Sequence, residues 1–112
     1  MERFHQQHFM RMRNFRVILD LGPASKGHSL ILPKKHAANI YELPDETAGK
    51  AMILAKKMAG KLRDALNCDG FNVVQNNGEI AGQTVFHFHM HLIPRYEGEW
   101  CWFNLETRRT QR

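Results

Sequence analysis

The stretch that decides the fold is Gly82-Gln83-Thr84-Val85-Phe86-His87-Phe88-His89-Met90-His91-Leu92-Ile93-Pro94, where three histidines alternate with apolar residues. Alternation with a period of two predicts a β-strand with all three imidazoles on one face. Residues two apart on such a face lie roughly 6.5–7 Å from each other, so the middle imidazole is flanked by the other two. Imidazole can act as nucleophile, base or acid near neutral pH, and the row predicts a reaction centre. The interleaved apolar residues are then expected in a core: Phe86, Phe88, Met90 and Leu92.

Metal binding is the main alternative for this row, because His-x-His on a strand is a common zinc or iron arrangement. The polar turn before the row instead supplies neutral donors: the amides of Asn76 and Gln83, the hydroxyl of Thr84 and backbone N–H groups such as that of Gly82. Such donors suit phosphate oxygens. No acidic residue or cysteine lies within or directly beside the row. We therefore expect an anion site without a metal, in which His89 is the nucleophile and His87 and His91 orient it.

Two sequence blocks before the row complete a recognisable pattern. They are Asp20-Leu21-x-Pro23 with Gly27-His28-x-Leu30-Ile31-Leu32-Pro33-Lys34, and Asn76-x-Gly78-x-x-Ala81-Gly82-Gln83-Thr84-Val85. From about residue 15 to residue 96 the chain closely resembles the histidine-triad (HIT) superfamily of nucleotide hydrolases.

The resemblance implies a hydrolase that cleaves a nucleoside 5′-phosphate from its leaving group through a covalent nucleotidyl-histidine on His89. It implies that His28 is the fourth histidine of the site and that Asp20 holds the ribose hydroxyls; from the residues alone, a turn-capping role for Asp20 stays open. The implied substrate is a purine nucleotide such as an AMP derivative, used without a cofactor by a homodimer. The nucleotide-binding residues expected in full are Asp20, Ile18, Leu21, Asn76, Gly82, Gln83 and Thr84.

The leaving group and the class of protein stay open at this point. A histidine at position 91 argues against the transferase branch, whose motif ends in glutamine, but phosphoramidates and dinucleoside polyphosphates fit equally. Two other classes also remain: a metal-binding β-protein that uses the His-x-His-x-His row, and a non-catalytic nucleotide-binding or scaffold protein.

Composition fits one small domain of 112 residues. The net charge of +5 lies largely near the termini and predicts solvated surface, and no nucleic-acid-binding motif is present. No apolar run approaches the ~20 residues of a membrane span. The isolated Cys68 and Cys101 predict a reducing, cytoplasmic location. Residues 1–14 lack the Cys-x-x-Cys of many relatives, so no structural zinc is expected.

Periodicity and turn residues predict an α+β fold: an antiparallel sheet with one long helix packed on one face and the histidine site on the other. Strands are expected at 15–21, 29–32, 71–75 and 85–93, and a helix at 44–67. We expect a basic, poorly ordered segment (1–14), a HIT-like domain (15–97) and a tail (98–112) that contains Trp100 and Trp102. The buried helix stripe is expected to be Ala48, Ala51, Met52, Ala55, Met58, Ala59, Leu62 and Leu66.

Overall fold

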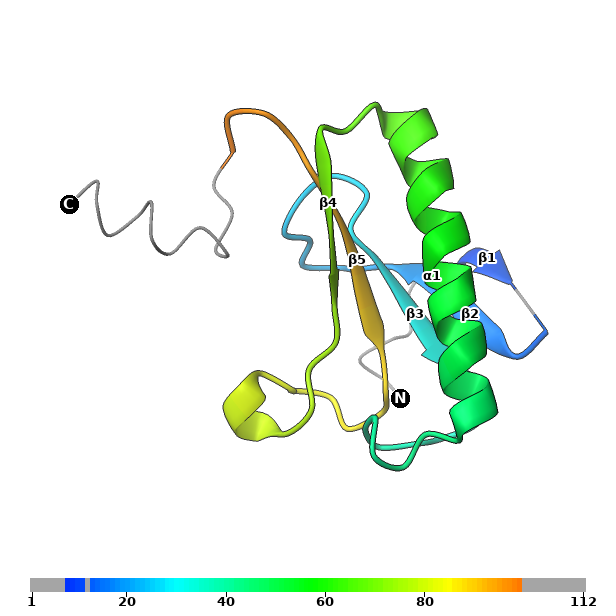
Figure 1. Cartoon of the computed structure of the whole chain (residues 1–112). Coiled ribbons are helices and arrows are strands. Elements are labelled where there is room, and N and C mark those ends of the chain that lie inside the picture. Colours follow the sequence, from blue (N-terminus) through cyan, green and yellow to red (C-terminus); the bar gives the residue numbers. More distant parts are fainter. Residues whose placement is uncertain (1–7, 12, 100–112) are drawn as a thin grey trace.

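The computed structural model describes residues 8–11 and 13–99, and it has the predicted α+β architecture, with one long helix packed on an antiparallel sheet (Figure 1). The five strands lie in the order β1-β2-β3-β5-β4, and every neighbouring pair is antiparallel. No helix of these residues is long and apolar enough to cross a bilayer. The elements are β1 (His8–Arg11), β2 (Phe15–Leu19), β3 (Ser29–Pro33), α1 (Asp45–Leu66), β4 (Gly70–Val74), the short 3-10 helix η2 (Glu79–Ala81) and β5 (Met90–Arg95).

Helix α1 follows the sequence pattern closely. It begins directly after Pro44, with acidic residues in its first turn, and ends at Asn67, whose left-handed backbone lets its N–H bond the carbonyl of Arg63 at 2.8 Å. The predicted stripe is wrong at Met52, which is 56% exposed, whereas Leu54 is buried. Spacings of three and four residues do not determine which side of the helix faces the sheet. Packing on the sheet buries Leu54 and leaves Met52 exposed.

The sheet presents different chemistry on its two faces. Toward α1 it buries an apolar layer that includes Val17, Ile31, Phe88 and Leu92. On the opposite face Ile18, Leu30 and Leu32 form a smaller buried cluster against Val85. Because the β3–β5 register pairs Leu30 with His91, the histidine lies beside this second cluster, on the face away from the helix. The prediction of one long helix packed on one face of an antiparallel sheet is confirmed, and His91 lies on the other face.

The histidine row departs from the predicted strand at its start. β5 begins at Met90, and residues 85–89 precede it. Phe86 is 55% exposed, so its predicted place in the core is wrong, while Phe88 is 1% exposed. The reason lies in the neighbouring segment: the Phe88 N–H bonds the Ala37 carbonyl at 2.7 Å, so this part of the chain runs against a loop and not against a strand.

A further strand, β1, precedes residue 15, where the sequence pattern predicts none. β1 lies within the basic segment 1–14 and pairs with β2, with a register shift between His8 and Met10. The tail residues Trp100, Cys101 and Trp102 lie outside the described residues.

Candidate active site

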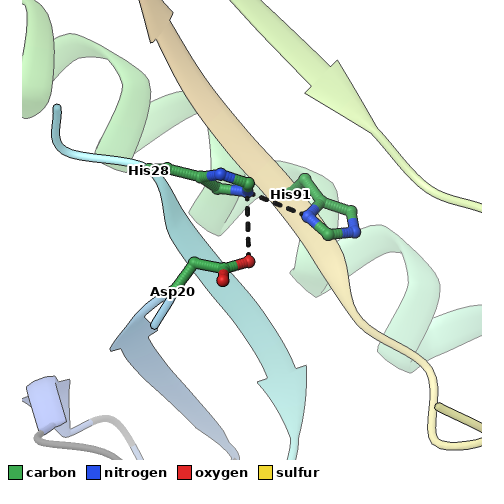
Figure 2. Close-up of side chains that lie close together, drawn as sticks. All are labelled: Asp20, His28 and His91. Carbon is green, nitrogen blue, oxygen red and sulfur yellow. Dashed lines mark hydrogen bonds and ion pairs between the residues drawn. The ribbon is translucent and has the colours of Figure 1, made fainter. Parts of the chain in front are cut away.

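Three side chains from separate elements meet on the face of the sheet away from α1. Asp20 lies just after β2, His28 just before β3, and His91 in β5 (Figure 2). The His28 Nε2 atom lies 3.0 Å from His91 Nδ1 and 3.5 Å from the nearer carboxylate oxygen of Asp20. The β2–β3 and β3–β5 registers bring these positions together, although 63 residues separate the two histidines.

The loop between β2 and β3 is held by its own backbone. The Asp20 N–H donates to the His28 carbonyl at 3.0 Å, and the other carboxylate oxygen of Asp20 accepts the Gly22 N–H at 2.8 Å. Asp20 therefore caps the turn with one oxygen and directs the other toward His28. Both roles considered for it, turn capping and participation in the site, are compatible with this geometry.

Hydrogen bonds to backbone groups decide which nitrogen of each ring carries the proton. The Ala24 N–H donates to His28 Nδ1 at 3.0 Å, so a neutral His28 carries its proton on Nε2. That Nε2–H donates to His91 Nδ1, and the proton of His91 must then lie on Nε2. His89 is the reverse, because its Nδ1–H donates to the His87 carbonyl at 2.8 Å and leaves a lone pair on Nε2. Adjacent rings thus present a lone pair on Nε2 of His89 and a hydrogen-bond donor on Nε2 of His91.

The rings stay neutral because they are buried. Burial lowers the pKa of His28, and Asp20 opposes this effect. Burial also lowers the pKa of His87 and of His89. For His91, burial and the neighbouring His89 and His28 lower the pKa from 6.5 to about 4. All four imidazoles are therefore uncharged at neutral pH, and the contact of His28 with Asp20 is not a full ion pair.

His87 is arranged differently from the rest of the row. Its Nε2–H donates to the Pro33 carbonyl at 2.8 Å, and its Nδ1 lies 3.0 Å from Nδ1 of His36. Both ring nitrogens therefore contact protein groups, and the side chain supports the segment whose carbonyl orients His89. The row pairs as His89 with His91 and as His87 with His36, at ring-centroid distances of 5.0 and 5.1 Å. His36 was not predicted to belong to the site, since its position after Lys34-Lys35 carries no periodic signal.

The other predicted binding residues lie in three settings. Ile18 is packed in the small apolar cluster, and Leu21 is 71% exposed. Gly82 has a φ of +97°. A Cβ at this position would lie 3.6 Å from the side-chain amide of Asn76, so Gly82 and Asn76 are neighbours in the fold. Thr84 is exposed, while Gln83 is buried with its amide bonded to backbone groups.

Asp20, His28 and His91 offer ligand atoms within 4.8 Å of one another, close enough to surround a metal ion. The tautomers argue against that use. A metal-bound imidazole normally donates its other N–H to an acceptor, whereas the other nitrogen of His28 accepts the Ala24 N–H. The nitrogen that faces Asp20 and His91 therefore carries a proton, which suits hydrogen bonding better than metal coordination.

Comparison with known proteins places this arrangement among relatives. The HIT domain family matches residues 3–98. The chain is 49% identical over 80 residues to "Protein hit" of Bacillus subtilis (strain 168), covering 71% of this chain and 55% of the relative. It is 48% identical over 79 residues to "Adenosine 5'-monophosphoramidase HNT1" of Saccharomyces cerevisiae, covering 70% and 48%. The chain spans about half the length of these curated relatives. A crystal structure of a HIT family protein from Bacillus anthracis superposes with a TM-score of 0.80 at 34% identity, covering 95% of this chain and 84% of the other.

Proposed function

Because the chain belongs to the HIT domain family, we propose that it hydrolyses nucleotides, releasing a nucleoside 5′-phosphate from its leaving group through a covalent intermediate on His89. The observation that carries the proposal is the opposite tautomers of two adjacent rings. His89 has its Nδ1–H fixed by the His87 carbonyl at 2.8 Å and therefore carries its lone pair on Nε2, whereas His91 has a donor on Nε2.

In the first step the lone pair of His89 Nε2 attacks phosphorus, and the bond to the leaving group breaks. The imidazole becomes positively charged, and the His87 carbonyl that accepts its Nδ1–H stabilises this charge. The leaving group departs with its electron pair and takes a proton from solvent water, and the exposed hydroxyl of Thr84 is proposed to donate a hydrogen bond to it. The Nε2–H of His91 is proposed to donate to a phosphoryl oxygen.

In the second step water attacks phosphorus, the bond to His89 breaks and the nucleoside monophosphate leaves. The attacking water releases a proton to solvent, which balances the proton taken up in the first step, and neutral His89 is restored with its proton on Nδ1. Asp20 is proposed to accept hydrogen bonds from the ribose hydroxyls. His87, with both ring nitrogens bonded to protein groups, is proposed to orient His89 through its carbonyl and not to bind phosphate.

We propose an AMP derivative as the substrate, and a phosphoramidate more specifically, because the yeast relative is named an adenosine monophosphoramidase. A homodimer is proposed through the edge strand β4, where Val73 exposes an apolar side chain. The cytoplasmic location inferred from the isolated cysteines stays a prediction.

Trapping the intermediate tests the proposal. Rapid quench with a labelled adenosine phosphoramidate is expected to yield an acid-labile nucleotidyl adduct on the wild type and none on His89→Ala. Turnover by His89→Ala should vanish while AMP binding stays measurable, and Tyr41→Ala, which alters an exposed side chain outside the site, serves as the matched control. An active His89→Ala variant would refute the role of His89. Parallel kinetics with a diadenosine polyphosphate decide the leaving group.

Two further measurements separate the alternatives. Activity that survives exhaustive chelation is expected here, and loss of activity that zinc restores would favour a metal site at Asp20, His28 and His91. AMP binding by a wild-type protein without turnover would favour a nucleotide-binding scaffold.

A further inference from the structure

Gln83 uses its entire side-chain amide within the protein. Its side chain is only 2% exposed. Its Oε1 accepts the Gly78 N–H at 2.8 Å, and its Nε2 donates to the carbonyls of Ala38 at 2.7 Å and Val85 at 3.1 Å. An amide has two N–H donors, and both are directed at backbone oxygens. A direct bond from this amide to phosphate would take a donor away from the partly buried carbonyl of Ala38 or Val85, which is costly.

These bonds fix the chain on both sides of Thr84. On one side, the Gln83 backbone N–H donates to the Gly78 carbonyl at 3.0 Å, so Gly78 and Gln83 exchange two hydrogen bonds across the turn. On the other side, the amide holds the carbonyl of Val85. Thr84 lies between these two fixed points with its side chain exposed. The position of its hydroxyl therefore depends on an amide that lies beneath it.

The same amide joins two loops that are distant in sequence. Ala38 belongs to the loop between β3 and α1, which lies at the same end of the molecule as the turn around η2 (Figure 1). The adjacent carbonyl of Ala37 accepts the Phe88 N–H, so consecutive carbonyls of this loop bind the turn and the histidine row. A second, separate connection is the bond from the Ile40 N–H to Asn77 Oδ1 at 2.7 Å.

We propose that Gln83 is a positioning residue. It sets the hydroxyl of Thr84 at the place where the leaving group binds, without touching the substrate. The inference rests on the proposed function, since it assumes that Thr84 faces the leaving group. It also replaces the phosphate contact expected for this side chain from the sequence.

The test compares Gln83→Met, which keeps the length of the side chain but removes its three bonds, with Asn77→Ala. The control removes the other bond between the same two loops and leaves both flanks of Thr84 intact. Both variants should lower the melting temperature. Only Gln83→Met should lower kcat for the phosphoramidate, by about 10–100-fold, because small misplacements at a reacting centre have effects of that order. KM should change less than about threefold, since the contacts to the ribose are separate.

Should Gln83→Met fail to fold, Gln83→Glu keeps the acceptor for Gly78, loses both donors and should also lower kcat.

A double-mutant cycle distinguishes positioning from general stabilisation. If Gln83 acts through Thr84, the Gln83→Met/Thr84→Val double variant should have a kcat no lower than that of Thr84→Val alone. Losses that multiply, or a Gln83→Met enzyme with wild-type kcat, would overturn this role and leave the proposed function intact. A wild-type protein without turnover would overturn both.

Discussion

Removal of the ring of Phe88 is expected to destabilise the protein far more than removal of the ring of Phe86, although the two residues occupy equivalent places in the alternating row. Phe88 is 1% exposed and packs in the layer between the sheet and α1, whereas Phe86 is 55% exposed. Burying a phenylalanine side chain contributes about 2–3 kcal/mol. The cavity left by Phe88→Ala adds to that loss, so the expected decrease in the free energy of unfolding is about 3–5 kcal/mol.

For Phe86→Ala the expected decrease is about 1 kcal/mol or less, because less than half of the ring is removed from water in the native state. Native stability of about 5–15 kcal/mol should leave both variants folded at low temperature. Urea unfolding followed by far-UV circular dichroism, which reports on α1, measures both values if the m-values agree with that of the wild type. Equal losses for the two variants would refute this account. They would mean that the strand extends back to Val85 and that both rings face the core, as alternation alone predicts.

Three other changes probe the loops and the charge state of the site. Gly27→Ala should lower the free energy of unfolding by about 2–4 kcal/mol, because φ is +89° and a Cβ would lie 2.3 Å from Leu66 Cδ1. The control Gly49→Ala, where a Cβ would have nothing within 4 Å, should raise the free energy of unfolding by about 0.8–1.0 kcal/mol. Changes of the same sign for both variants in thermal or urea unfolding would contradict the geometry. Asp20→Ala should weaken ribonucleotide binding by roughly one to two powers of ten, since charge-assisted hydrogen bonds contribute ~1.5–3 kcal/mol. Calorimetry should find little effect of the substitution on the binding of a 2′,3′-dideoxy ligand. An equal loss of affinity for both ligands would leave only the turn-capping role for Asp20. The free energy of unfolding should fall as the pH drops from 6.5 toward about 4, because His91 binds a proton in the unfolded chain in this range and does not in the native protein. Urea midpoints measured across this window should fall less steeply for His91→Asn than for the wild type. Equal slopes for the two proteins would contradict the lowered pKa of His91.

Regular patterns in the sequence predicted the elements but not the contacts made by loops. Period-two alternation identified β5 and the face of His91, and Pro44 predicted the start of α1. The same alternation placed the start of β5 five residues too early, because the Phe88 N–H bonds the carbonyl of Ala37 in a loop and not a neighbouring strand. Spacing along one segment contains no information about such a distant loop.

The candidate site shows the same division. The motif blocks named the residues that meet at the site, including His28 and Asp20. They did not predict that the Ala24 N–H fixes the tautomer of His28, or that His87 turns toward His36. Both features depend on where backbone groups lie in the folded chain, which residue type and spacing do not determine.

Strand β5 serves two faces of the sheet at once: Met90 and Leu92 pack toward α1, and His91 between them belongs to the site. A substitution that shifts this strand to suit a new substrate would also disturb the apolar layer on its other side. In the loops after β2 and β4, Leu21 and Thr84 are exposed and pack in neither apolar layer. Divergence in substrate choice should therefore accumulate in these loops, while the central strand stays constrained by packing and chemistry together.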